Sequence, residues 1–219
     1  MPVSASQPAI LARGPWPAHA IEAHWIDEPY EPDPEHTRAA DEAIAALRER
    51  GSPSHDGVAA RLAGHRVTDD GRLVLDLQPL RWALRLVPGD ASDSLSALCV
   101  TRDAQRRWLA GRRAAWLSSW AGEWALGAGG AVDPHENPAR TLARELREEW
   151  SVEAERLTGE ALVALPGRMT MFIGMAWLPE GAEVVPDDEH DAHAWWPADP
   201  DEWPEEAHPA LRQMAALLA

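Results

Sequence analysis

The segment that most constrains this chain is GAVDPHENPARTLARELREEWSV, residues 130–152. Asn137 followed by Pro138 is typical of a helix N-cap with proline in the first helical position, so the sequence predicts a helix at about 138–150. At about 100° per residue, one flank of this helix is apolar. That flank carries Ala139, Leu142, Ala143, Leu146 and Trp150. The helix therefore has one side suited to a protein core.

Three glutamates, Glu145, Glu148 and Glu149, fall within a sector of about 100° on another flank of the same helix. Carboxylates three and four residues apart repel, and the last two also lie at the negative end of the helix dipole. Each effect costs only about 0.3–1 kcal/mol, so a solvated acidic face is the plain interpretation. A hard divalent cation would reverse the sign of both effects, because Mg²⁺ binds carboxylate and phosphate oxygens.

The residues around these acids follow a fixed pattern. The matching positions are Gly130, Glu136, Arg144, Glu145, Leu146, Glu148, Glu149 and Val152. They resemble the box of the Nudix hydrolases, Gx5Ex7REUxEExGU, where U is a bulky aliphatic residue, and the one departure is Ser151 in place of glycine. The resemblance implies an α+β fold, a Nudix α/β/α sandwich with a mixed β-sheet.

The resemblance also implies a metal site in which Glu145, Glu148 and Glu149 hold Mg²⁺ or Mn²⁺, joined by the backbone carbonyl of Gly130. Arg144 would form an ion pair with Glu136 that orients the neighbouring acids. At Ser151, the left-handed conformation that glycine adopts would cost serine about 1 kcal/mol, so the end of the helix could differ slightly from the family's.

Composition limits the partners. The chain has 20 basic and 36 acidic residues and a net charge of −16, which argues against a surface for duplex nucleic acid or an anionic membrane. Cys99 is the only cysteine, so no intramolecular disulfide can form, and it fits a small core residue in a strand. There is no evident signal peptide and no long apolar segment, so a cytoplasmic location is expected.

The sequence divides the chain into three parts. Residues 1–34, rich in proline and alanine, predict an irregular lead-in, and residues 35–92 predict a smaller αβ segment. The Nudix domain is expected over 93–219. Within the αβ segment the patterns predict a helix at 35–50, a second short helix at about 56–63, and strands at 66–68, 73–77 and 82–87. Two roles of this segment stay open: it could join two subunits into a homodimer, or it could cover the substrate pocket.

From residue 94 onward the predicted order fits the family. Strands are expected at 94–101, 106–112, 162–165, 169–177 and 192–196, followed by a closing helix at 209–218. The loop before the box has a glycine spacing that resembles isopentenyl-diphosphate isomerase, but that enzyme's catalytic cysteine motif is missing and Cys99 lies elsewhere.

Several residues outside the box are candidates for the site. Arg112 and Arg113 end a predicted strand and could donate to a substrate phosphate, although arginine at a strand end is more often solvated. Trp124, like Trp116 and Trp120, could stack on a base or form part of the core. Glu189 lies where many Nudix enzymes place a further acid, with a solvated loop as the alternative. The nearby His190 and His193 need not be ligands.

The resemblance implies Mg²⁺-dependent hydrolysis of a phosphoanhydride, with Glu145, Glu149 and Arg144 in the catalytic machinery and Glu145 or Glu189 accepting a proton from water. We expect a small nucleotide substrate, a nucleoside diphosphate linked to a sugar or another group. Two alternatives stay open. One is a house-cleaning hydrolase of oxidised nucleoside triphosphates, and the other is a non-catalytic Nudix module that senses a nucleotide.

Overall fold

The structure is a computed structural model that describes residues 7–52, 56–117 and 119–218. Its helices are α1 (Pro34–Glu49), α2 (Pro138–Trp150) and α3 (Pro209–Leu218), with short 3-10 helices η1 (Ala18–Ala20), η2 (Trp82–Leu86) and η3 (Pro200–Glu202). Its strands are β1 (Ala9–Pro17), β2 (Ile21–Trp25), β3 (Val58–Val67), β4 (Leu73–Arg81), β5 (Ser94–Arg102), β6 (Trp108–Arg113), β7 (Trp124–Leu126), β8 (Ala128–Ala131), β9 (Arg156–Leu165), β10 (Met169–Trp177) and β11 (His190–Trp196). None of the described helices has the length and apolar character needed to cross a membrane.

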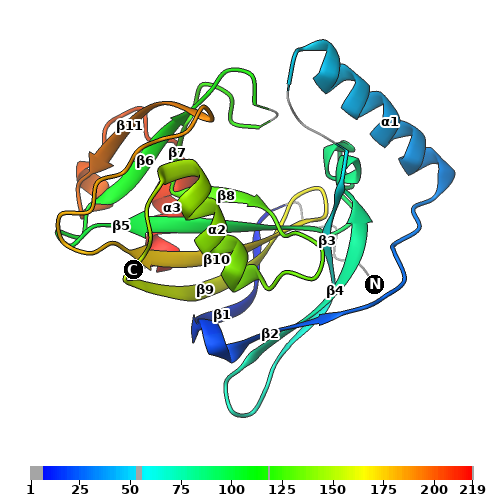
Figure 1. Ribbon diagram of the computed structural model, residues 1–219, viewed down its shortest axis with the longest axis horizontal. Coiled ribbons are helices and arrows are strands. Elements are labelled where there is room, and N and C mark those ends of the chain that lie inside the picture. Colours follow the sequence, from blue (N-terminus) through cyan, green and yellow to red (C-terminus); the bar gives the residue numbers. More distant parts are fainter. Residues whose placement is uncertain (1–6, 53–55, 118, 219) are drawn as a thin grey trace.

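The described strands form one mixed sheet in the order β1-β9-β10-β5-β3-β4-β2 (Figure 1). β10 runs parallel to β5, and β9 pairs antiparallel with β10. On the other side of β5 the path branches, because β8 pairs with its middle and β6 with its end, and β6 in turn pairs with β7 and β11. The expected mixed sheet of an α+β fold is confirmed.

Helices α2 and α3 lie on opposite faces of this sheet, α2 in front and α3 behind (Figure 1). Alternate residues of the central strands point to the two faces, as the two-residue period of a strand requires. Phe172 of β10 packs in the cluster that contains Leu142 of α2, whereas Ile173 packs in the cluster that contains Leu211 of α3. The α/β/α layering follows from this alternation.

Helix α2 begins and ends where the sequence predicts. The side chain of Asn137 accepts a hydrogen bond of 2.9 Å from the backbone N–H of Ala139, and Pro138 occupies the first turn. The helix ends at Ser151, which adopts the left-handed conformation with φ 52° and ψ 33°. The exit from the helix is therefore the one that glycine usually makes, despite the serine.

The N-terminal lead-in differs from the prediction. The described part of residues 1–34 is not irregular, because β1 pairs antiparallel with β9 and extends the sheet at its edge. β1 places Ala12 and Trp16 against the core, and β2 runs parallel to β4. The proline and alanine content that predicted a loop is compatible with an edge strand, where a missing N–H is tolerated.

Two further elements differ from the prediction. The short helix predicted at about 56–63 is instead part of β3, which pairs along its length with β4 as a long hairpin. The strand predicted at 82–87 is instead the 3-10 helix η2. Here the backbone N–H of Ala83 donates to the Asp56 side chain, and Ala83 and Leu84 are buried against α1. Both changes come from tertiary contacts that override the local apolar pattern.

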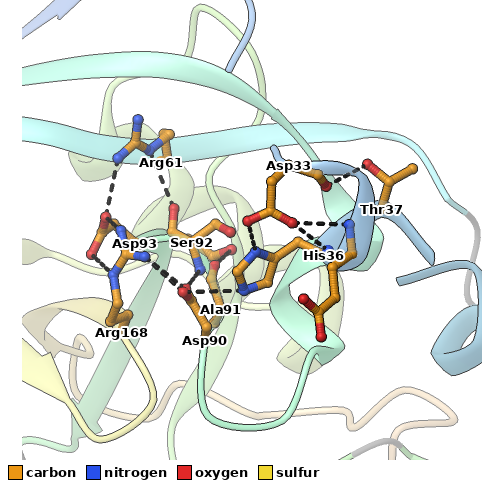
Figure 2. Close-up of polar contacts among 11 residues, drawn as sticks. Asp33, His36, Thr37, Arg61, Asp90, Ala91, Ser92, Asp93 and Arg168 are labelled. Carbon is orange, nitrogen blue, oxygen red and sulfur yellow. Dashed lines mark hydrogen bonds and ion pairs between the residues drawn. The ribbon is translucent and has the colours of Figure 1, made fainter. Parts of the chain in front are cut away.

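A polar network joins the N-terminal segment to two loops of the sheet (Figure 2). Arg168, in the turn between β9 and β10, pairs with both Asp90 and Asp93. Arg61 of β3 pairs with Asp93 at 3.0 Å, and His36 of α1 reaches Asp90 at 3.2 Å. These ion pairs fix the position of residues 88–93 between α1, β3 and the β9–β10 turn.

Candidate active site

Two buried glutamates of α2 meet the glycines of β8. The backbone N–H of Gly129 donates a hydrogen bond of 2.8 Å to Glu149 Oε1. The other oxygen, Glu149 Oε2, lies 3.6 Å from His190 Nε2, and both of these buried atoms have no hydrogen-bond partner among the described residues. Burial raises the pKa of Glu149 well above its ordinary value, and the nearby Glu145 adds to the shift.

Glu145 occupies the space that a side chain at Gly130 would need. A Cβ built on Gly130 would lie 2.6 Å from the carboxyl carbon of Glu145, closer than such atoms approach. Burial raises the pKa of Glu145 to about 7, against the opposing effect of Arg144. The glycine of the box therefore has a steric role, because it lets the carboxylate lie against the backbone of β8.

Arg144 connects the acids of the box. Its guanidinium contacts Glu145 at 2.8 Å, Glu148 at 2.9 Å and Glu136 at 3.2 Å, and it also donates to the backbone carbonyl of Ala131. The ion pair expected between Glu136 and Arg144 is present. Glu148 is exposed, whereas the Glu145 carboxylate is held between Arg144 and β8. The positive charge of the Arg144 guanidinium thus offsets part of the repulsion among these carboxylates.

The donor set has the chemistry of a hard divalent cation. No described group of three or more His, Cys, Asp or Glu side chains lies at metal-ligand spacing as it stands. Glu149 Oε2 is nevertheless a buried oxygen without a partner, and Glu145 is a buried acid whose pKa is raised. Carboxylate oxygens are the ligands that Mg²⁺ prefers, and its charge would offset the desolvation of both groups. The residues present therefore fit such an ion.

A cavity of about 870 Å³ lies beside these acids. Its lining includes Gly129 and Gly130, so the strand that contacts Glu149 and Glu145 also forms part of its wall. Most of the remaining lining is apolar and comes from β5, β9, β10 and α3. Two arginines, Arg85 and Arg113, are the charged side chains of the lining. A volume of this size is typical of a site for a small molecule.

The structure brings some of the predicted substrate residues to this cavity and leaves others outside it. Arg113 lines the cavity and lies 3.5 Å from Glu189. Arg112, the next residue on β6, is exposed and pairs with Asp191 at 2.6 Å. It is outside the cavity because successive residues of a strand point to opposite faces.

Trp124, predicted to contact substrate, also lies outside the cavity lining. Its ring packs 5.7 Å from that of Trp196 and belongs to the core on the α3 side of the sheet. Trp120 lines the cavity in its place, with its ring 5.1 Å from that of His208. Which loop tryptophan reaches the cavity depends on the path of the loop, and the sequence does not show that path.

Glu189 lies near the buried acids. Burial raises its pKa, while Arg113 opposes that shift, and its charge in turn contributes to the raised pKa values of Glu145 and Glu149. The neighbouring His190 is buried, with its ring 4.4 Å from that of Trp150. Burial lowers the pKa of His190, so the imidazole facing Glu149 is favoured in its neutral form.

Nothing in the sequence indicates that Arg85 lines the cavity. Residues 82–87 predict a strand, and a single arginine in a predicted strand does not indicate a pocket. Cys99 is fully buried in β5, as predicted for a core residue. Burial raises the pKa of its thiol to about 12, which is unsuited to a catalytic nucleophile.

Comparison with protein-family models identifies a known domain in this chain. The NUDIX domain model matches residues 93–218. Similar solved structures include a Nudix hydrolase from M. smegmatis, RenU (23% identity, TM-score 0.41, covering 71% of this chain and 91% of that chain). They also include the NUDIX domain of Shewanella oneidensis NrtR complexed with ADP ribose (17% identity, TM-score 0.44, covering 57% of this chain and 85% of that chain). A third is a C. elegans Ap4A hydrolase (20% identity, TM-score 0.43, covering 56% of this chain and 92% of that chain). No curated protein matches this chain. Because the NUDIX match spans more than half of its residues, the chain belongs to the NUDIX family and is a Nudix-type hydrolase acting on phosphorus-containing acid anhydrides.

Proposed function

We propose that this chain is a Mg²⁺-dependent pyrophosphohydrolase that cleaves the phosphoanhydride of a nucleoside diphosphate linked to another group, as in an NDP-sugar or ADP-ribose. One observation carries the proposal. The buried carboxylates of Glu145 and Glu149 lie against the two glycines that also form the wall of the large cavity. The proposed metal ligands of α2 and a pocket for a small molecule therefore both contact β8.

The ligands of the metal would be Glu145, Glu148 and Glu149, with the backbone carbonyl of Gly130. Such a cation supplies charge neutralisation on the phosphates and lowers the pKa of bound water. Arg144 would act as a positioning residue, because it holds the carboxylates of Glu145 and Glu148 through one guanidinium. Burial alone would lower the pKa of Arg144, but the hydrogen bond to Glu136 and the charges of Glu145 and Asp133 raise it, so the guanidinium stays charged.

Glu189 is our candidate for the group that accepts the proton of the attacking water. It lies next to the buried acids without belonging to the proposed ligand set, and burial raises its pKa above that of an ordinary glutamate. A base works best when its pKa approaches the working pH. Arg113, 3.5 Å away, would keep the carboxylate oriented and would balance its charge.

The cavity supports a substrate with both a charged and a less polar part. Its lining includes Arg85, Arg113 and the two glycines of β8, and it also includes the apolar side chains of Met169, Met171 and Met214. Methionine side chains adapt to irregular shapes and pack against aromatic rings, so this lining could receive a base or a sugar-linked group.

The test is a panel of NDP-sugars, dinucleotides and nucleoside triphosphates, incubated with the purified full-length chain with and without Mg²⁺ and assayed for phosphate and pyrophosphate. We expect Mg²⁺-dependent splitting of diphosphate bridges. Pyrophosphate release from triphosphates alone would favour the house-cleaning alternative. Nucleotide binding without turnover would favour the sensing module.

A further inference from the structure

Arg85 enters the cavity from outside the residues that match the NUDIX domain. It lies on η2, which follows β4 and precedes the loop to β5. η2 is held by a small core of its own, in which Ala83 and Leu84 pack against Ile44 and Leu47 of α1. The N-terminal segment thus places a guanidinium in the wall of the cavity.

The guanidinium of Arg85 has few partners of its own. Its Nη2 donates a hydrogen bond of 2.9 Å to Ser96 Oγ, and its Cζ lies 5.4 Å from the Trp82 ring. It forms no ion pair with any residue in the part of the chain that the structure describes. A guanidinium carries five N–H donors, so most of its hydrogen-bonding capacity is left to solvent or a ligand.

This arrangement contrasts with that of two arginines in the polar network around residues 88–93. Arg61 pairs with Asp93, and Arg168 pairs with Asp90 and Asp93 (Figure 2). Burial lowers the pKa of Arg85, because removal from water disfavours the charged form.

We propose that Arg85, together with Arg113, forms an anion site in the cavity that binds the diphosphate group of the substrate. The identity of the anion rests on the proposed function. Planar guanidinium groups bind phosphate oxygens with two parallel hydrogen bonds, which fixes the orientation of the phosphate. The N-terminal segment then supplies part of the substrate site, and α1 stabilises the element that carries it.

The charges around Arg85 support this assignment. Glu145 and Arg113 are both near enough to shift its pKa, in opposite directions. Glu145 also lies against Gly130, which lines the cavity together with Arg85 and Arg113. A diphosphate placed there would contact the guanidinium of Arg85, and Glu145 would be available to hold the proposed cation.

The experiment uses inorganic pyrophosphate as the probe. The full-length wild-type chain and the variants Arg85→Gln and Arg85→Lys are titrated with pyrophosphate by calorimetry, once with Mg²⁺ and once with EDTA. The matched control is Arg106→Gln, which removes the same charge from an exposed arginine that lines a separate, smaller cavity. Thermal unfolding of every variant checks that the fold is retained.

We expect Arg85→Gln to weaken pyrophosphate binding about 10- to 100-fold, as for the loss of charge-assisted hydrogen bonds. Arg85→Lys should recover part of this loss, and Arg106→Gln should bind within about twofold of the wild type, as expected for a distant surface charge. With a substrate from the panel, KM should rise more than kcat falls.

Equal affinity in Arg85→Gln and the wild type would overturn the proposal. So would equal losses in Arg85→Gln and Arg106→Gln, or no pyrophosphate binding by the wild type in either buffer. The outcome is separate from that of the proposed function, because pyrophosphate binding that depends on Arg85 can occur in a protein that turns over no member of the panel.

Discussion

Glu149 Oε2 and His190 Nε2 face each other across 3.6 Å in the core, and neither atom has a hydrogen-bond partner among the described residues. A buried polar atom left unsatisfied costs about 1–3 kcal/mol. The carboxylate is held in place on its other side by the N–H of Gly129, so it cannot relax freely toward solvent. Without a bound ion, the buried Glu149 carboxylate therefore lowers the stability of the folded protein, and a cation at this position would offset that cost.

Replacing this glutamate should separate folding from activity. We expect Glu149→Gln to lower Mg²⁺-dependent turnover by at least about 100-fold, because even outer-shell changes at metal sites cost 10- to 100-fold. Mg²⁺ should raise the unfolding temperature of the wild type and not of the variant, since only the wild type binds the ion tightly. In EDTA the variant should be as stable as the wild type or more so, because an amide is cheaper to bury than a charge.

The control for this experiment is Glu153→Gln, which removes an exposed carboxylate just beyond the same helix. It should leave turnover and the Mg²⁺ effect unchanged. Normal turnover in Glu149→Gln would remove the role in metal binding that we assign to Glu149.

Gly130 of the box and Gly127, just before it, should respond differently to alanine. At Gly130 a Cβ would meet the side-chain carboxylate of Glu145, which can shift without moving the backbone, so we expect Gly130→Ala to fold but to lose about 100-fold in turnover, as for a misplacement of about 1 Å. At Gly127, where φ is +66°, a Cβ would lie 2.7 Å from the backbone carbonyl carbon of Cys99. Gly127→Ala should therefore lose at least about 2 kcal/mol of stability.

Urea unfolding and turnover measured on both variants check this pair. A Gly130→Ala protein with full activity would show that the contact between Gly130 and Glu145 is not needed. A stable Gly127→Ala protein would show that β7 and β8 can shift away from β5.

The sequence predicted the parts of this protein that depend on local chemistry. Helix α2 was correctly bounded because Asn137 and Pro138 act through the adjacent backbone. β1 was missed because its partner, β9, lies far along the chain and its edge position tolerates proline. β3 was assigned in part to a helix because its apolar residues are buried by a hairpin that the local pattern does not reveal.

The candidate site was predicted to a similar extent. The ion pair of Arg144 with Glu136 follows from the motif, and its geometry is present. Arg112 and Arg113 could not be told apart, because strand register decides which of them reaches the cavity. The position of Arg85 in the cavity wall depends on the packing of η2 against α1, and neither segment carries a motif that predicts this contact. The roles of the carboxylates in catalysis stay predictions.

His36 provides a test of the network between α1 and the loops. A hydrogen bond to Asp33 raises the pKa of His36 above 6.5, with further help from Asp90 and Glu35, while Arg168 neutralises part of the charge of Asp90. A histidine with a raised pKa adds stability below its unfolded pKa, and this contribution is lost as the pH rises through the folded pKa. Stability from this contact should therefore decline above about pH 6.5.

The measurement is an NMR titration of the His36 ring in the wild type and in Asp33→Asn. Asparagine keeps the N-cap of α1, so the helix should be retained. We expect the variant to lower the pKa of His36. The same pKa in both proteins would show that the hydrogen bond in Figure 2 does not set it.

Ser151 offers a stabilising change at the end of the box helix. Its φ of 52° lies in the left-handed region, which costs a residue with a Cβ about 1–2 kcal/mol. Its N–H donates a hydrogen bond of 3.0 Å to the carbonyl of Arg147, so the conformation is part of the helix end. Ser151→Gly removes the steric cost but increases the entropy of the unfolded chain, and the net gain should be about 0.5–1 kcal/mol. Urea unfolding measures this gain, and Ser151→Ala, which keeps the Cβ, should show none. A glycine variant no more stable than the alanine variant would mean that serine adopts this conformation without strain.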